Sequence, residues 1–263
     1  MPQQLFSFKI MTYNIHSCIN VYGRESPADI VRAIARIDPD IVALQEVEAM
    51  GPLMYYRNQA EWIAEKLDMQ ARFYPLRKSR WGYFGTAILT RFPHYMVKNG
   101  LLPSRDANPT KEPRGAAWIC LQTANGPIHI VNTHLGLRMR DRHSQVRRLL
   151  GRHWLGSISS EEPIILCGDF NAGPRSLEYR MLSARFKDVQ VHARQKGYPK
   201  PTFFSLYPVL RIDHIFVSDH FMPLQITIPS DLSSRKASDH LPVCALMALS
   251  TEAAVPKIAA GRQ

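Results

Sequence analysis

The apolar segment 163–167 ends abruptly in the polar sequence Gly168-Asp169-Phe170-Asn171, and this junction strongly constrains the fold. An apolar run of this length fits one buried strand, and the glycine and proline that follow at positions 173 and 174 signal a turn. Asp169 and Asn171 therefore stand where a core strand runs out into a loop, two positions apart, so that both side chains can point the same way. The pattern alone leaves two readings open. One is an ordinary turn, in which Asp and Asn bond their own backbone. The other is a site that holds a metal, or a water and a phosphoryl oxygen.

Similar apolar runs recur along the chain and alternate with helical patterns. Strands are expected at 6–12, 41–45, 86–90, 116–122, 128–133, 212–217 and 241–249, and helices at 27–37, 56–68, 142–158 and 176–183. The alternation is not a strict βαβ series, which favours a layered, mixed α/β fold. No repeat, linker or boundary divides the chain. We therefore expect one domain over residues 1–250 and a loose tail at 251–263, where no periodicity is found.

The net charge of +11, from 33 basic and 22 acidic residues, favours an acidic partner. Nucleic acid, an anionic membrane surface and a phosphorylated small molecule all fit, and no obligate protein partner is indicated. No apolar run is long enough to cross a bilayer, and the first residues lack the pattern of a signal peptide. The four cysteines are far apart and form no zinc or CxxC pattern. Free thiols in a reducing compartment, the cytoplasm, are therefore expected.

Polar residues stand at the ends of several predicted strands, and open α/β sheets bind ligands beyond the strand ends. They are Asn14, Glu46, His134, Asp169, Asn171, Asp213 and the pair Asp239-His240. This set contains hard oxygen ligands and two histidines but no matched cysteines, so it suits magnesium or manganese better than zinc. Taken alone, either histidine fits a packed, hydrogen-bonded residue better than a site, whereas a solvated strand end is the lesser alternative for Glu46, since a carboxylate directly after a buried run is costly unless it is paired.

Six short motifs resemble those of the endonuclease/exonuclease/phosphatase superfamily, in the order in which that family carries them. They are Thr12-Tyr13-Asn14, Leu44-Gln45-Glu46, Asn132-Thr133-His134, Gly168-Asp169-Phe170-Asn171, Arg211-Ile212-Asp213 and Ser238-Asp239-His240-Leu241-Pro242. Each motif alone is weak, but together they span residues 12–242. The resemblance implies a four-layer sandwich, with two mixed β-sheets face to face and helices outside, which agrees with the α/β pattern above.

The resemblance also implies a metal site. Glu46, helped by Asn14, would be the main ligand of a divalent ion, Mg²⁺ or Mn²⁺, and Asp239 would be a second metal contact or would orient the metal's waters. Such an ion would neutralise a phosphate oxygen and the leaving oxygen.

The remaining matched residues would act on the phosphoryl group. By resemblance, Asp169 would orient or deprotonate the attacking water, and Asn171 would hold that water or donate to an oxygen of the phosphorane. His134 would donate to a non-bridging oxygen. His240 would be the second histidine at the phosphate, with its tautomer and charge fixed by Asp213.

Three arginines are expected to bind substrate. Arg114 lies in a segment that resembles one that many family members place near the phosphate, where a guanidinium can bind in bidentate fashion; a surface salt bridge is the alternative. Arg138 and Arg140 begin a run of six arginines between positions 138 and 152. This run could concentrate a polyanion at the mouth of the site or could simply form a solvated helix face.

The implied function is divalent-metal-dependent hydrolysis of phosphodiester bonds by an activated water. A nuclease acting on DNA or RNA is the first expectation, because of the positive charge and the arginine run. The aromatic and basic stretch 72–84, which includes Trp81, could stack a base, dip into lipid headgroups or only pack. Abasic-site repair and inositol phosphatase activity are disfavoured, since the residues after Asn171 lack the polar loop and the extra lysines of those branches.

Two other functions stay open at this point. The first is a phospholipid phosphodiesterase at an anionic membrane surface, which an exposed aromatic hairpin near the site would favour. The second is a non-catalytic module that binds polyanions. The second is disfavoured because no expected catalytic residue is replaced.

Overall fold

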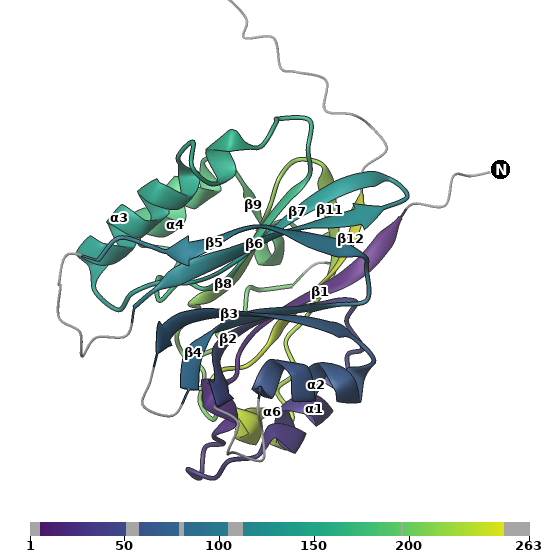
Figure 1. Ribbon diagram of the computed structural model, residues 1–263, viewed down its shortest axis with the longest axis vertical. Coiled ribbons are helices and arrows are strands. Elements are labelled where there is room, and N and C mark those ends of the chain that lie inside the picture. Colours follow the sequence, from purple (N-terminus) through teal and green to yellow (C-terminus); the bar gives the residue numbers. More distant parts are fainter. Residues whose placement is uncertain (1–5, 51–57, 79–81, 105–112, 196, 250–263) are drawn as a thin grey trace, which may run out of the picture.

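Two six-stranded β-sheets lie face to face, with helices on the outer side of each (Figure 1). Helices α3 and α4 cover one sheet, and α1, α2 and α6 cover the other. The expected fold, a four-layer α/β sandwich of two mixed sheets flanked by helices, is confirmed. The computed structural model describes residues 6–50, 58–78, 82–104, 113–195 and 197–249.

The strand order is β11-β12-β1-β2-β4-β3 in the first sheet and β5-β6-β7-β8-β10-β9 in the second. The first sheet consists of β1 (Ser7–Asn14), β2 (Ile41–Met50), β3 (Gln70–Lys78), β4 (Gly82–Thr90), β11 (Phe221–Thr227) and β12 (Val243–Leu249). The second consists of β5 (His94–Leu101), β6 (Gly115–Thr123), β7 (Gly126–His134), β8 (Ile164–Asp169), β9 (Lys187–Asp188) and β10 (Asp213–Val217).

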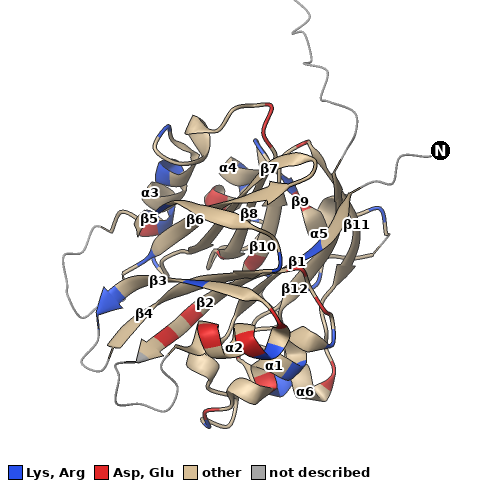
Figure 2. Cartoon of the chain, turned by 45° about the vertical axis from the view of Figure 1, so that its right-hand side comes forward, with Lys and Arg blue, Asp and Glu red and all other residues tan. Residues whose placement is uncertain are grey.

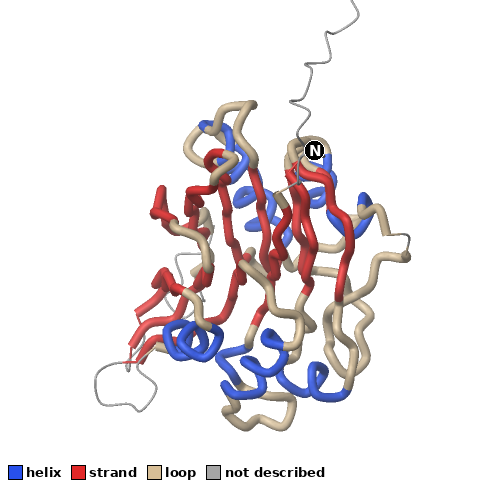
Figure 3. Tube along the Cα trace, turned by 90° about the vertical axis from the view of Figure 1, so that its right-hand side faces the viewer, coloured by secondary structure: helices blue, strands red, loops and turns tan. Residues whose placement is uncertain are grey.

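A parallel pair lies at the centre of each sheet, β1 with β2 and β7 with β8. The flanking pairs, such as β1 with β12 and β8 with β10, are antiparallel. The carboxyl end of β8 therefore lies beside the start of β10. Figure 3 shows the loops, coloured tan, that join the strands beyond their ends.

The helices are α1 (Pro27–Ala35), α2 (Gln59–Leu67), α3 (Met139–Leu150), α4 (Leu177–Ser183), α5 (Val189–His192) and α6 (Leu232–Ala237), with short 3₁₀ turns η1 (His16–Cys18) and η2 (Leu155–Ser157). Side-chain caps fix several of their starts. Asn58 accepts from the first backbone amides of α2, and Asp231 does the same for α6, an arrangement that contributes about 1 kcal/mol per helix. None of the described helices is long and apolar enough to cross a membrane.

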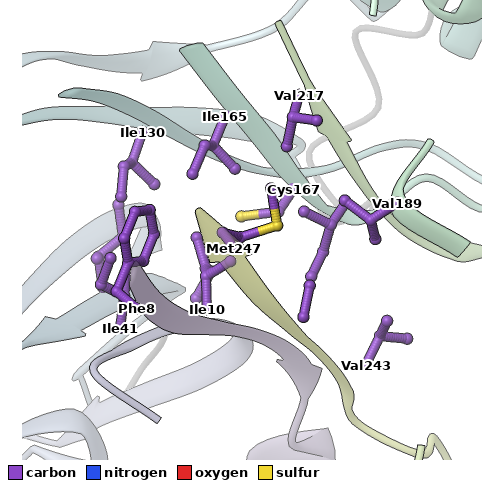
Figure 4. Packing of buried hydrophobic residues seen from close by; sticks show 14 of the residues in the cluster. Phe8, Ile10, Ile41, Ile130, Ile165, Cys167, Val189, Val217, Val243 and Met247 are labelled. Atoms are coloured by element: carbon purple, nitrogen blue, oxygen red, sulfur yellow. The ribbon is translucent and has the colours of Figure 1, made fainter. Parts of the chain in front are cut away.

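The main core lies between the two sheets (Figure 4). Phe8 and Ile10 of β1 meet Ile130 of β7 and Ile165 of β8 there, and all four side chains are buried. Each such side chain stabilises the fold by roughly 1.5–3 kcal/mol. The alternate residues of β1, Met11 and Tyr13, belong to a second cluster under the helices. Since β1 is buried on both faces, its apolar residues form an almost continuous run.

The structure corrects two of the expected boundaries. The strand expected over 41–45 continues past Glu46 to Met50, because a β-bulge between Leu44 and Val47 accommodates the polar residue without ending the strand. The helix expected over 142–158 begins at Met139 and ends at Leu150, since Gly151 turns the backbone away before the 3₁₀ turn η2. The remaining predicted helices and strands are found within a few residues of their expected ends. The tail 251–263 and Trp81 lie outside the described residues.

Candidate active site

Strand register sets three of the expected site residues in one row across the second sheet. His134 at the end of β7 pairs with Asp169 at the end of β8, and Asp169 pairs with Asp213 at the start of β10. Because paired residues of neighbouring strands point to the same face, these side chains converge. All three are buried.

The first sheet brings its residues to the same place. Asn14 ends β1, and its amide Nδ2 donates to Asp169 Oδ2 at 3.1 Å. His240 precedes β12, and its Nε2 lies 3.7 Å from the same oxygen. Residues spread from position 14 to position 240 are thus gathered at one buried carboxylate between the sheets.

Asp169 is the centre of this cluster. Its Oδ2 lies 3.3 Å from His134 Nε2, in addition to the contacts with Asn14 and His240, and its Oδ1 accepts from the backbone N–H of Asn171 at 2.9 Å. Burial acts to raise the pKa of Asp169, but the two histidines outweigh it and hold that pKa well below its usual range. The carboxyl group therefore stays ionised and is ready to orient or accept a proton from a water.

The proton on His134 can be placed from its neighbours. Nη1 of Arg114 lies 2.8 Å from Nδ1 of His134. A guanidinium can only donate, so Nδ1 accepts and the ring carries a hydrogen on Nε2. That hydrogen faces Asp169 Oδ2, while the amide Nδ2 of Asn171, which is itself a donor, lies 3.3 Å from the same ring nitrogen. Arg114 thus acts on the site through His134.

His240 is paired with a buried carboxylate on its other side. Nδ1 of His240 lies 2.8 Å from Asp213 Oδ2. Burial would lower the pKa of His240, but the carboxylates of Asp213 and Asp169 reverse this and raise the pKa of His240 to about 10. The ring is therefore a cation at neutral pH, and Nε2 is a charged donor beside Asp169.

Thr202 completes this pair and was not singled out by the sequence. Its hydroxyl donates to Asp213 Oδ2 at 2.5 Å, on the oxygen that also faces His240. A lone threonine in a loop carries no signal of its own. Only the register of the bridge between Phe203 and His240 brings it to Asp213.

Glu46 lies in the β-bulge of β2 with a positive φ of 55°. A bulge re-aims the side chain that it carries, and Glu46 Oε1 accepts from Asn14 Nδ2 at 3.0 Å. Asn14 therefore holds Glu46 and Asp169 through the same amide group, while its Oδ1 accepts from the backbone N–H of His16 at 3.1 Å. Figure 2 shows the acidic residues of β2 in red.

The described donors fit a hard divalent cation. Glu46 and Asp169 both accept from the amide of Asn14, and Asp239 lies 3.9 Å from His16. Asp169, Asp213 and His240 also offer ligand atoms that lie within 4.8 Å of one another. We favour the Glu46 side for a cation, since His240 Nδ1 and Asp213 Oδ2 already bond each other. Carboxylate and amide oxygens suit Mg²⁺ or Mn²⁺.

Two of the three expected substrate-binding arginines line a cleft, and the third lies on the surface of α3. Arg114 and Arg138 line one cleft of about 230 Å³, together with Gly136, Asp141 and Gln145. Arg140 lies exposed on the first turn of α3, where Figure 2 shows basic residues in blue. The structure thus brings Arg114 to the histidine of the site and Arg138 to a neighbouring cleft.

A polar bridge between the sheets lies directly behind the site and was also missed by the sequence. Gln45 Nε2 donates to Asn132 Oδ1 at 2.8 Å, and Asn132 Nδ2 donates to the carbonyl oxygens of Leu44 and Ala87, each at 2.9 Å. Gln45 directly precedes Glu46, and Asn132 lies two positions before His134. Each belongs to the same sequence motif as that site residue. Their side chains align the two sheets at the level of the site.

Two carboxylates, two histidines and an amide gathered between two mixed sheets fit the chemistry of phosphoester hydrolysis. The chain belongs to the Endonuclease/Exonuclease/phosphatase family, whose model matches residues 11–240. Membership places it in a superfamily of phosphodiesterases and phosphatases.

Individual proteins are similar to this chain in sequence or in fold. The chain is 29% identical over 258 residues to the uncharacterized protein YbhP of Escherichia coli, in an alignment that covers 93% of this chain and 98% of that protein. Its fold is similar to that of the endonuclease/exonuclease/phosphatase from Beutenbergia cavernae, with a TM-score of 0.74, 22% identity, and 93% of this chain and 72% of that chain covered. It is also similar to a mannosyl-6-phosphatase of Bacteroides thetaiotaomicron, with a TM-score of 0.72, 20% identity, and 91% and 99% covered.

Proposed function

We propose that the protein is a divalent-metal-dependent phosphodiesterase that uses Asp169 to activate water. The observation that carries the proposal is the convergence of two histidines on one oxygen of Asp169, at 3.3 Å for His134 and 3.7 Å for His240. This arrangement supplies an acceptor for a water proton between two donors for phosphoryl oxygens.

Each residue has a role in that reaction. Asp169 accepts a proton from water as the water oxygen bonds to phosphorus. His134 Nε2 and the cationic His240 donate to the non-bridging oxygens, on which negative charge grows. Asn171 is held in place through its bond to the carbonyl oxygen of Leu135 at 2.9 Å, and it holds the water. One P–O bond forms and one breaks. The leaving oxygen takes up a proton from solvent to become an alcohol, and Asp169 returns the proton that it accepted to solvent.

Glu46 and Asn14, with Asp239, would hold the cation. When bound, a Mg²⁺ or Mn²⁺ ion would offset the charge of a phosphate oxygen and of the leaving oxygen. Asn14 keeps Glu46 and Asp169 in fixed relation through its amide, so the ligand and the water-activating group stay aligned.

Nucleic acid is the first candidate substrate. Its support is the net charge of +11 and four exposed arginines. Arg138 directly precedes α3, and Arg140, Arg147 and Arg148 lie on that helix. Such charge attracts any polyanion. A phospholipid is the second candidate, and a specific observation favours it: large apolar side chains are exposed on a loop that contacts His240.

The test of the proposed chemistry is hydrolysis of bis-p-nitrophenyl phosphate with Mg²⁺ or Mn²⁺. We expect turnover that EDTA abolishes and that either ion restores. Asp213→Asn should lower kcat by roughly 10²–10⁴-fold with little change in KM, because His240 loses its charged partner. Asp219→Asn, which alters an exposed acid paired with Lys187, is the matched control and should keep full activity. Absence of hydrolysis with both ions, or an active Asp213→Asn, would contradict the proposal.

A further inference from the structure

The loop 202–210 exposes large apolar side chains at the candidate active site. Tyr207 is 82% exposed and Val209 is 78% exposed, and Phe204 and Leu210 are also exposed. The loop is next to the catalytic cluster, since Phe203 forms a bridge with His240 and the backbone N–H of Ser205 donates to the carbonyl oxygen of Asp239 at 2.7 Å. Water-exposed apolar groups gathered in this way mark an interaction surface.

The loop is held in shape by bonds at both its ends and in its middle. Phe203 and Leu210 bond each other's backbones, at 3.0 and 2.8 Å. The hydroxyl of Ser205 donates to the carbonyl oxygens of Arg235 and Ser238, at 2.8 and 2.7 Å. Arg235 Nη1 donates to the carbonyl oxygen of Leu206 at 2.5 Å. The apolar side chains are therefore presented by a preformed loop, so that binding costs little ordering entropy.

A second exposed segment follows the other histidine of the site. Leu137 and Met139, three and five positions after His134, are 74% and 65% exposed. They alternate with the exposed Arg138 and Arg140. Apolar side chains interspersed with arginines at one short turn match the composition of a surface that enters the headgroup layer of an anionic bilayer.

The side chains of these two segments favour a lipid over a nucleic acid as the ligand of this surface. A single-stranded nucleic acid is bound by aromatic rings on which bases stack. Four of the six exposed apolar residues are aliphatic and offer no such ring. They are Leu137, Met139, Val209 and Leu210. Aliphatic side chains gain free energy in contact with acyl chains, and the arginines match anionic headgroups in charge.

We propose that the loop 202–210 and the segment 137–140 form a docking surface for an anionic phospholipid membrane, which presents a headgroup phosphodiester to His134 and His240. This inference rests on the proposed function for the hydrolysis step, while the docking itself is independent of catalysis. The two apolar segments enter the headgroup layer, and Arg138 and Arg140 contact lipid phosphates.

The first experiment is co-sedimentation with vesicles of phosphatidylglycerol and phosphatidylcholine, compared with vesicles of phosphatidylcholine alone. We expect the protein to bind the anionic vesicles more strongly. Tyr207→Ser/Val209→Ser should weaken that binding by about tenfold or more, while hydrolysis of bis-p-nitrophenyl phosphate stays unchanged. The matched control is Tyr95→Ser/Val97→Ser, since these residues are 51% and 39% exposed on β5 with the same spacing. This control should bind vesicles as the unaltered protein does.

A second pair of variants tests the charge. Arg138→Gln/Arg140→Gln should remove most of the preference for anionic vesicles and reduce its dependence on salt. Arg147→Gln/Arg148→Gln, which changes two exposed arginines at the other end of α3, should remove much less. Equal losses in the two variants would mean that net charge, not this surface, attracts the membrane.

The failures of the two proposals can be told apart. Metal-dependent hydrolysis of the small diester without vesicle binding would overturn the docking surface and leave the proposed function intact. Vesicle binding without any hydrolysis of the small diester would overturn the proposed function and leave the docking surface intact. If Tyr207→Ser/Val209→Ser impaired binding to DNA or RNA and left vesicle binding unchanged, the occupant of this surface would be a nucleic acid and the membrane proposal would be wrong.

Discussion

The histidines of this chain differ in the groups that face their two ring nitrogens, and these groups decide which form each ring takes. A guanidinium faces one nitrogen of His134, and a carboxylate faces each nitrogen of His240. His129, within β7, instead accepts from Trp118 Nε1 on its Nδ1 at 3.0 Å, while its Nε2 lies 3.3 Å from Glu162. Trp118 and Glu162 therefore hold the ring of His129 from both of its nitrogens.

The stability of the protein should depend on pH through His129. Burial lowers the pKa of His129, and Glu162 opposes that shift only in part. Because the folded pKa lies below that of the unfolded chain, about 6.5, the unfolded state binds more protons in the window between them. The stabilisation of the folded state by neutral His129 is therefore complete above the unfolded pKa of about 6.5. It is lost as the pH falls through the lowered pKa of the folded state.

Urea unfolding at pH 7.5 and at steps down to pH 5 measures this effect. In His129→Gln, the loss of stability over that range should be smaller than in the unaltered protein, because the residue that gains the proton is gone. An identical pH dependence in the two proteins would show that another group is responsible.

Among the elements, the contact between β7 and β8 depends on a glycine. Gly168 has a φ of 144°, and a Cβ at this position would lie 1.8 Å from the carbonyl oxygen of Thr133. The residue therefore allows β8 to pass close enough to β7 for Asp169 to face His134. The sequence shows a glycine before an aspartate, but only the packing reveals why another residue does not fit.

Gly168→Ala should lower the free energy of unfolding by several kcal/mol, since the added methyl overlaps a backbone atom that cannot move without opening the sheet. Gly126→Ala is a matched control, because Gly126 also has a positive φ, 102°, but has open space around it. That control should cost only about 1 kcal/mol, from backbone conformation alone. Chemical denaturation of both variants measures the difference. Equal costs would mean that the backbone at position 168 can shift to make room.

Element by element, the sequence was most informative where strands are buried on both faces. The continuous apolar runs of β2 and β8 and the alternation at the start of β1 located those strands, whereas β3 was missed because it lies at a sheet edge with one face partly exposed and carries no such pattern. The β-bulge at Glu46 could not be foreseen either. Its left-handed backbone is set by pairing with β4, not by a glycine or proline.

For the molecule as a whole, the packing of one sheet on the other fixes the site. Asn132→Ala should remove the bridge to Gln45 and both bonds to the carbonyl oxygens of Leu44 and Ala87. We expect a loss of roughly 2–4 kcal/mol in the free energy of unfolding, and a fall in activity on the small diester, because Glu46 follows Gln45. Asn99→Ala, at an exposed position of β5, is the control and should change neither quantity. Normal activity in Asn132→Ala would show that apolar packing alone aligns the sheets.

The motifs could name the charged residues of the site, because each one lies at or near an end of a recognisable strand or interrupts one. They could not name Thr202 or the bridge between Gln45 and Asn132. Those neutral residues gain their meaning only from contacts made across the two sheets and the loops between them. The site roles of the arginines likewise depend on where α3 begins, which differs from the expected start by three residues.

His134, Asp169 and Asp213 belong to one sheet, while Asn14, Glu46 and the residues before β12 belong to the other. During refolding, either sheet could regain its hydrogen-bonded strands before the two sheets pack together, and the protein would still have no phosphodiesterase activity. Recovery of turnover would therefore time the final docking step, separately from the return of the circular dichroism signal. Two complementary fragments of this chain would have to assemble before either showed any enzymatic rate.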